Sequence, residues 1–226
     1  MTTDGAHETG EPAAGAPRRR LPFVIAAAAV AAATGLGLFY GMGGFSRKVA
    51  GEAACAPAVA TASRLKPLLR GEVAAILPAT DAQRVPDLAF TDTGGAARRL
   101  AEFRGRWVLV NLWATWCAPC RAEMPALDAL QARLGGDRFE VVAIDLDTRN
   151  PERARTFLGE IGVRRLAFYA DHSAQVLRDL RTIGRAVGLP TTLLVDPAGC
   201  EVAHLPGPAN WASEDASALI RAAVGG

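Results

Sequence analysis

The chain of 226 residues lacks the features that mark several large classes of protein. Its net charge is only +2, which leaves no charged excess of the kind that binds nucleic acid or another polyanion. Four cysteines are too few for a scaffold held together by disulfides, and the 23 glycines have no collagen-like period. Hydrophobic residues make up 50% of the chain, more than a disordered chain contains and enough for one domain with its own core.

The apolar residues are concentrated in one uncharged run near the N-terminus. Residues 21–45 would span roughly 37 Å as a helix, whereas the hydrocarbon core of a bilayer is about 30 Å thick. Three arginines at 18–20 precede the run, and Arg47 and Lys48 follow it, which favours a cytoplasmic N-terminus. We therefore interpret the run as a single-pass anchor in the inner (cytoplasmic) membrane, with a disordered cytoplasmic tail at 1–20 and the remaining chain in the periplasm.

Two other interpretations of this run stay open. A cleaved signal peptide has the same order of features, although its apolar stretch is usually shorter. A lipoprotein site at Cys55 would need an apolar residue where Glu52 stands. A buried soluble helix is disfavoured because the run has no polar face. Whether the run is an anchor or a cleaved signal peptide, the rest of the chain is expected to be exported.

From residue 85 onward, apolar runs alternate with helical patterns. The runs at 107–114 and 139–147 predict strands covered on both faces, and the 3/4 spacing after Cys117 predicts a helix that reaches about Leu134. Such alternation predicts an α/β fold whose sheet is mainly parallel, with an antiparallel hairpin at its edge. Further expected elements are a connecting helical region (46–84), a hairpin (86–103), a strand (166–171), the closing hairpin (190–205) and helices (151–161, 173–184, 214–224).

The strongest chemical signal is Trp116-Cys117-Ala118-Pro119-Cys120, which follows a predicted strand and opens a predicted helix. The free N–H groups and partial positive charge of a helix N-terminus stabilise a thiolate at Cys117, and the thiolate is the reactive form. The two-residue spacer brings Cys120 one turn further along, close enough to bond the first sulfur. The pattern therefore favours a redox-active dithiol.

Half of a zinc site is the structural alternative for the cysteine pair. The second half would come from Cys200 and His204, but residues four apart on a strand stand about 13 Å apart, too far to share one ion. A purely structural CxxC disulfide is a further alternative. Asp145 and Asp147 end a predicted strand and are expected to be solvated or capping. The sequence therefore predicts no metal site.

A second motif, Gly188-Leu189-Pro190-Thr191-Thr192, enters a predicted strand. Proline is tolerated at a strand start, so taken alone the motif also fits a proline that only marks the beginning of a strand. The chemical interpretation is a cis Leu189–Pro190 bond facing the cysteine pair, which leaves the backbone of Leu189 free to bind a substrate chain.

The stretches VLVNLWATWCAPCRAEMPAL and GLPTTLLVD together resemble membrane-anchored thioredoxin-like proteins, specifically the TlpA group of thiol:disulfide interchange proteins, which is related to the cytochrome c maturation thioredoxins. The resemblance covers roughly residues 52–224. It implies a thioredoxin-like fold over 85–226, with a central mixed sheet flanked by helices. It also implies an enzyme, a protein-disulfide reductase that needs no cofactor.

The resemblance assigns roles to single residues. Cys117 is the exposed nucleophile and Cys120 the resolving thiol, Trp116 packs beside them, and Pro190 is the cis-proline. Glu123 matches a buried acid of the cytochrome c maturation branch, and because residues three apart share a helical face, its carboxyl is expected to approach the sulfur of Cys120. The alternative is an ordinary first-turn helix acid.

Asn111 departs from the family pattern, because thioredoxin itself carries a buried Asp at this position. Proton handling by that Asp is therefore not expected here, and Glu123 is the candidate replacement. Cys55 and Cys200 are expected to form a structural disulfide that ties the connecting region to the closing hairpin, since an exported chain favours disulfides and the resemblance points the same way. The alternative is two unrelated cysteines.

The expected partners are disulfide-bearing client proteins. By resemblance these are apo-proteins of respiratory-chain assembly, such as copper-site proteins of cytochrome oxidase or apocytochrome c, and a membrane thiol transporter supplies the electrons. Two other functions occur on this fold. A peroxiredoxin-type peroxidase usually has Thr three residues before the attacking Cys, whereas Thr115 is two before Cys117; a copper-binding assembly protein uses a CxxxC spacing and a positioned His.

Overall fold

The computed structural model of the chain describes residues 53–225, which belong to one compact unit. The predicted tail (1–20) and anchor (21–45) lie outside the described residues. Within the described part, no helix is both long and apolar enough to cross a membrane.

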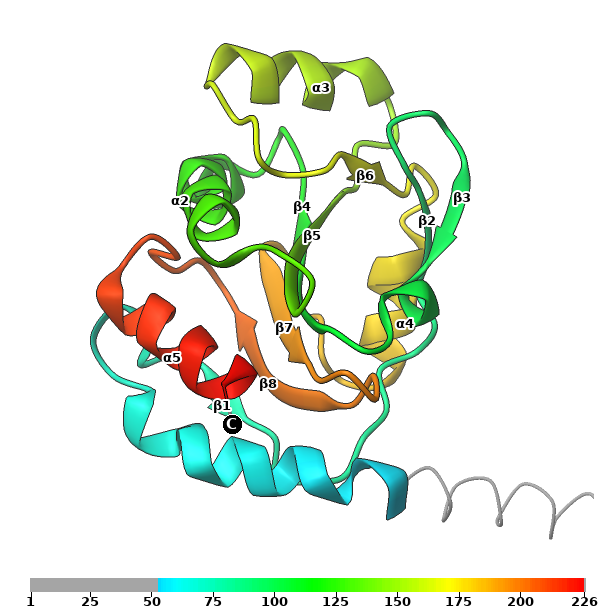
Figure 1. Cartoon of the computed structure of the whole chain (residues 1–226). Coiled ribbons are helices and arrows are strands. Elements are labelled where there is room, and N and C mark those ends of the chain that lie inside the picture. The colour runs from blue at the N-terminus through cyan, green and yellow to red at the C-terminus, as the bar shows by residue number, and fades with distance from the viewer. Residues whose placement is uncertain (1–52, 226) are drawn as a thin grey trace, which may run out of the picture. The chain divides into compact units, whose positions relative to one another are not determined.

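An eight-stranded mixed sheet forms the centre of the unit, in the order β1-β8-β7-β4-β5-β6-β2-β3 (Figure 1). The central strands β4 and β5 are the long apolar runs that the sequence predicts, and each begins and ends within two residues of the predicted bounds. The strands are β1 (Leu77–Pro78), β2 (Ala89–Thr91), β3 (Ala97–Arg99), β4 (Trp107–Trp113), β5 (Phe139–Asp145), β6 (Tyr169–Ala170), β7 (Thr191–Val195) and β8 (Glu201–Pro206).

The prediction of a mainly parallel sheet is wrong. Only the pairs β4–β5 and β5–β6 are parallel, and the other neighbouring pairs are antiparallel. After α4 (Gln175–Thr182) the chain enters the sheet beside β4 in the opposite direction, so β7 does not continue the parallel series. The closing hairpin is not an edge either, because β1 pairs with the outer side of β8, where Leu77 lies opposite His204. A two-residue strand is too short to show a periodicity in the sequence.

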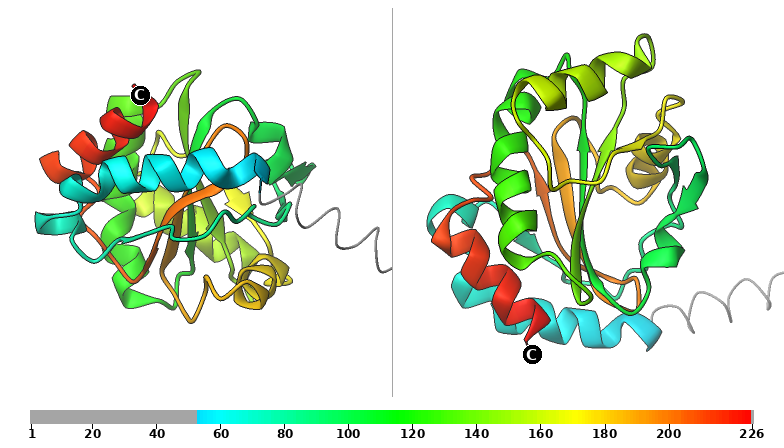
Figure 2. Two further views of the ribbon diagram at one scale, coloured as in Figure 1. Left: turned by 90° about the horizontal axis from the view of Figure 1, so that it is seen from below. Right: turned by 45° about the horizontal axis from the view of Figure 1, so that its top comes forward.

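Helices cover both faces of the sheet. In the right-hand view of Figure 2, α2 (Ala118–Leu134) and α4 lie on opposite sides of the central strands. The helix at 53–65, α2, α3 (Pro151–Glu160) and α5 (Glu214–Val224) pack on one core, and α4 packs with η3 (Leu100–Phe103) on the other. Leu109 and Trp113 of β4 face the first core and Val110 the second. The alternation of side chains along a strand thus buries both faces of β4.

The predicted connecting region folds against the sheet. The helix at 53–65 is followed by two 3₁₀ helices, η1 (Lys66–Leu68) and η2 (Gly71–Val73), and then by β1. Cys55 of the first helix is joined to Cys200, which directly precedes β8, across 145 residues of sequence. The α-helix ends at residue 65, and Pro67 is the second residue of the 3₁₀ turn η1 that follows it.

Candidate active site

The cysteine pair lies where β4 gives way to α2. Cys117 is the N-cap residue of α2, and its Sγ accepts a hydrogen bond from the backbone N–H of Cys120 at 3.3 Å. The two sulfurs form a disulfide, with 5.3 Å between the Cα atoms. Cys117 is 6% exposed in this disulfide form, less than the sequence predicts, and Cys120 is fully buried. Cys117 is therefore the sulfur that another protein can reach.

The loop before β7 lies at the same end of the sheet. Thr191 pairs with Leu112, so the start of β7 lies beside the end of β4, a few residues before Cys117. The Leu189–Pro190 peptide bond is cis. Neither the N–H nor the C=O of Leu189 has a hydrogen-bond partner among the described residues. Both groups are therefore available to pair with an extended client backbone.

Two protruding apolar side chains flank this end of the sheet. Trp116 is 68% exposed and Val187, in the loop before the cis peptide, is 81% exposed. They are the most exposed large hydrophobic residues of the described chain. Single exposed apolar residues are ordinary on protein surfaces, so it is the position of these two at the end of the sheet with the cysteine pair, and not their exposure alone, that marks them as candidate contacts. The sequence singled out Trp116, whereas Val187 gave no signal because a single valine in a loop has no pattern.

Glu123 is buried at the centre of α2, with 3% of its surface exposed. Its Oε1 accepts a hydrogen bond from Asn111 Nδ2 at 2.8 Å, and its Oε2 accepts bonds from Trp211 Nε1 and the Ala209 N–H, each at 3.3 Å. Burial raises the pKa of Glu123 to about 7, against the lowering effect of these three donors. The interpretation of Glu123 as an ordinary first-turn acid is therefore wrong.

Asn111 connects this carboxyl to the strand that carries the cis-proline. Its Nδ2 also donates to Thr192 Oγ1 at 3.0 Å, while its Oδ1 is buried without a partner. The sequence identified Asn111 as a departure from the family pattern, but it did not predict the hydrogen bond that Asn111 donates to Glu123. The available signal was an amide in the middle of a strand covered on both faces, which requires a buried polar partner.

Glu123→Gln is expected to lower the pKa of the reduced cysteine pair and to slow disulfide reduction near neutral pH. The carboxylate adds negative charge on the helical face that it shares with Cys120, which disfavours a thiolate there, and a group with a pKa near 7 can exchange a proton during turnover. Thiolate absorbance against pH measures the first effect and the pH profile of turnover the second.

The same substitution is expected to change the pH dependence of stability. Because the folded-state pKa of Glu123 lies above its ordinary value of 4.5, the group destabilises the fold progressively as the pH rises from about 4.5 to about 7. Glu123→Gln should remove this fall in the melting temperature, and the exposed control Glu72→Gln should keep it. Superimposable thiolate titrations of wild type and Glu123→Gln would contradict a role beside the dithiol.

Asp145 and Asp147 are buried, so of the two expected roles, solvated or capping, the solvated one is wrong. Asp147 Oδ2 accepts the Thr115 N–H at 3.1 Å, just before the cysteine motif, and Asp145 Oδ1 accepts the Asp147 N–H at 3.3 Å. Asp145 Oδ2 has no partner. Burial, and then the neighbouring Asp147, raise the pKa of Asp145 to about 8. The capping part of the prediction holds for Asp147, because the loop that leads to Trp116 folds over the end of β5 and covers it.

The two histidines of the described chain make local contacts. His172 Nδ1 lies 2.9 Å from the carbonyl oxygen of Asp147, and His204 Nδ1 lies 2.8 Å from Glu201 Oε1. Within residues 53–225, no group of three or more Cys, His, Asp or Glu side chains is placed to hold a metal ion.

The fold and this disulfide define a thioredoxin-like thiol:disulfide oxidoreductase. Residues 82–203 match the AhpC/TSA family, and the chain belongs to that family. Similar proteins and solved structures confirm the resemblance to thiol:disulfide interchange proteins that the two sequence motifs indicate.

Two similar proteins carry names that state a redox role. Thioredoxin-like protein YneN of Bacillus subtilis is 32% identical over 122 residues, which cover 53% of this chain and 67% of that protein. Thiol-disulfide oxidoreductase ResA of Bacillus cereus is 28% identical over 125 residues, which cover 55% of this chain and 69% of that protein.

Solved structures agree. A putative thiol:disulfide interchange protein DsbE from Chlorobium tepidum has a TM-score of 0.54 at 29% identity and covers 63% of this chain and 96% of its own. A putative thiol-disulfide oxidoreductase from Bacteroides vulgatus has a TM-score of 0.52 at 28% identity and covers 65% of this chain and 96% of its own.

Proposed function

We propose that the protein is a membrane-anchored periplasmic reductase that reduces disulfides in client proteins of respiratory-chain assembly. The observation that carries the proposal is the Cys117–Cys120 disulfide at the N-terminus of α2, at the same end of the sheet as the unpaired backbone of Leu189. The names of the relatives, thiol-disulfide oxidoreductase and thiol:disulfide interchange protein, support the redox chemistry.

The reaction needs no group beyond the two cysteines. In the reduced enzyme, the thiolate of Cys117 attacks one sulfur of the client disulfide, and the other client sulfur leaves as a thiolate. Cys120, once deprotonated, attacks Cys117 and releases the first client sulfur. The client gains two electrons and two protons and becomes a dithiol, while the enzyme is left in the disulfide form. The helix N-terminus favours the attacking thiolate, and Glu123 is the nearby group whose pKa suits the proton transfer.

The proposed location rests on two observations. The uncharged run at 21–45 is long enough to anchor the chain, with the N-terminus in the cytoplasm. The Cys55–Cys200 disulfide fits an oxidising compartment such as the periplasm. A membrane thiol transporter would then return electrons to the oxidised enzyme. Recovery of the full chain in the soluble fraction, or protection of the domain from protease in spheroplasts, would contradict this location.

The reductive direction is testable with the purified full chain in detergent. The reduced enzyme is expected to convert one disulfide of a copper-site protein, or of an apocytochrome peptide, to a dithiol for each enzyme disulfide formed. Thiol counting on both partners measures the balance. Peroxide consumption without client reduction would instead indicate a peroxidase, and net oxidation of reduced clients would reverse the proposed direction.

A further inference from the structure

Two adjoining cavities open beside the dithiol, between its loop and the start of α3. One, of about 460 Å³, is lined by Trp116, Arg149 and Arg153 among others. The second, of about 440 Å³, continues from Arg153 along α3 to Phe157. Both are lined by Thr115, Asn150 and Arg153, so they form one groove that begins at the exposed Trp116.

Three arginines line this groove, which we call the arginine groove: Arg121, Arg149 and Arg153. All three are exposed, and none forms an ion pair within the described residues. The guanidinium of Arg121 lies over the ring of Phe157, 4.9 Å from its centroid, which holds it at the groove wall. Within the described residues, the groove thus presents guanidinium groups that are not held in an ion pair.

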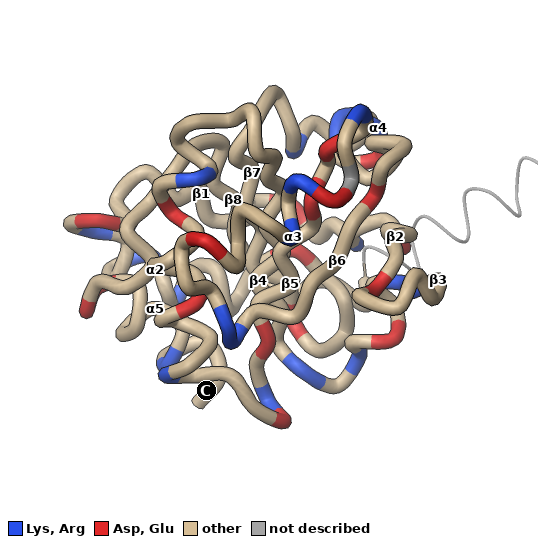
Figure 3. Tube along the Cα trace, turned by 90° about the horizontal axis from the view of Figure 1, so that it is seen from above, with Lys and Arg blue, Asp and Glu red and all other residues tan. Residues whose placement is uncertain are grey.

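The basic excess of the groove is confined to its end at Trp116, where Arg149 and Arg153 face one acid, Asp147, whereas Glu152 and Glu160 balance Arg121 and Arg153 in the other cavity. Asp147 is buried and accepts the N–H of Thr115. Glu152 lies 4.0 Å from Arg155, and Glu160 lines only the cavity farther from Trp116. Elsewhere along the trace, basic and acidic residues are interspersed (Figure 3).

We propose that the arginine groove binds an acidic segment of the client next to its target disulfide, a proposal that rests on the proposed function. A client cysteine bonded to Cys117 places its neighbouring residues at Trp116, and the groove starts there. Carboxylates of that segment would meet Arg149 and Arg153, whose guanidinium groups suit bidentate pairing with a carboxylate. The groove therefore selects clients by the charge beside the disulfide.

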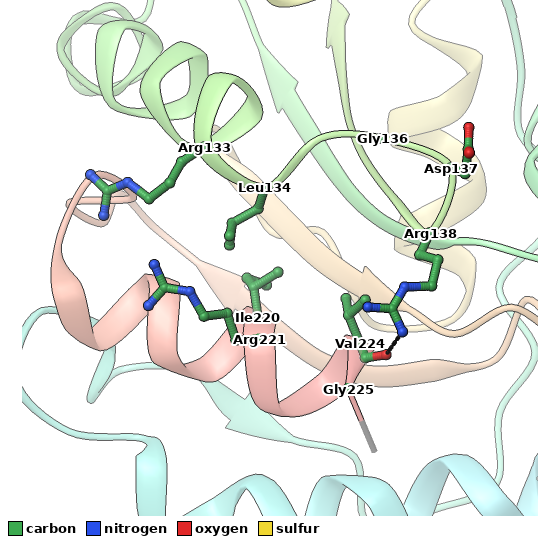
Figure 4. A pocket seen from close by; sticks show the side chains of 9 residues that line it. All are labelled: Arg133, Leu134, Gly136, Asp137, Arg138, Ile220, Arg221, Val224 and Gly225. Carbon is green, nitrogen blue, oxygen red and sulfur yellow. Dashed lines mark hydrogen bonds between the residues drawn. The ribbon is translucent and has the colours of Figure 1, made fainter.

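The chain offers a matched control at another cavity, of about 640 Å³. Figure 4 shows Arg133, Arg138 and Arg221 around it, between the end of α2 and α5. Arg133 donates to Glu214 and Ser217, and Arg138 donates to the carbonyl of Val224. This cavity lies at the opposite end of α2 from the dithiol, roughly 25 Å away along a helix of 17 residues. Charge changes there are screened from the dithiol at moderate salt.

The test uses the reduced full chain and three peptides, each with one internal disulfide and identical except for Glu, Gln or Lys beside it. At about 0.1 M salt, where the Debye length is about 10 Å, the wild type is expected to reduce the Glu peptide about tenfold faster than the Lys peptide, and about 1 M salt should abolish the ratio. Arg149→Glu/Arg153→Glu should invert the preference. The control Arg138→Glu/Arg221→Glu carries the same change of net charge and should keep it.

Equal rates for the Glu and Lys peptides in the wild type would overturn the proposal. Inversion by the control pair would also overturn it, because the effect would then follow net charge and not the groove. Failure to reduce the Gln peptide would count against the proposed function instead. In that case the ratio of the rates for the Glu and Lys peptides is measured with the oxidised enzyme and reduced peptides, since thiol–disulfide exchange runs in both directions.

Discussion

Cys120→Ser is expected to turn the protein into a trap that accumulates mixed disulfides with its clients, whereas Cys117→Ser should trap nothing. The difference follows from burial. Cys117, at 6% exposure, is the sulfur a client can reach, and the fully buried Cys120 can act only on a disulfide already formed at Cys117. Loss of the nucleophile should lower client reduction by at least about a thousandfold.

The measurement is non-reducing electrophoresis of membranes from cells that express the full-length variants. Bands of higher mass should appear with Cys120→Ser and disappear on addition of reductant. The double variant Cys117→Ser/Cys120→Ser is the control for contacts through Cys55 or Cys200. Equal trapping by both single variants would show that the roles of the two cysteines are not distinct.

Removal of the buried Cys55–Cys200 disulfide is expected to cause a large loss of stability. The bridge closes a loop of 145 residues, for which the chain-entropy model gives about 5 kcal/mol as an upper value. Cys55→Ala/Cys200→Ala should therefore lower the melting temperature by up to about 10–20 °C. The active-site pair should still exchange disulfides at temperatures where the variant is folded, because the bridge lies away from Cys117.

Calorimetry of the full chain, with the Cys117–Cys120 pair intact, measures this loss. The single variants Cys55→Ala and Cys200→Ala should lose as much as the double variant, since each removes the same bridge. Cys117→Ala/Cys120→Ala is the matched control, because its loop closes over a separation of only 3 residues. A melting temperature that is unchanged in all three bridge variants would show that the packing of the helix at 53–65 holds the segment without the bridge.

Local patterns predicted those parts of the fold that depend on neighbours in the sequence. The apolar run of β4 predicted a strand covered on both faces, and the placement of Cys117 before a helical pattern predicted its N-cap position. The order of the strands depends on partners far apart in the chain, so the antiparallel entry of β7 and the pairing of β1 were not predicted.

The same reasoning applies to the site. The cysteine motif is local, so the sequence alone predicted the dithiol. The cis bond at Pro190 was predicted through the family resemblance. Glu123 was singled out, but its partner Trp211 stands 88 residues further on, and no spacing rule connects them. Asp145 and Asp147 were expected to be solvated or capping. The loop before the cysteine motif packs there, with the Thr115 N–H donating to Asp147, and the sequence around the two acids does not show this contact. Burial of a single acid depends on such long-range packing.

The outer strands of the sheet are short, which limits the addition of a foreign strand at either edge. Exposed strand edges are templates for the addition of foreign strands. Here β1 has two residues and ends in Pro78, which lacks an N–H, and β3 has three residues, of which Arg98 and Arg99 are charged. Neither edge offers more than three residues for backbone pairing with another chain. The short, proline- or arginine-bearing edges thus protect the folded domain from edge-to-edge association.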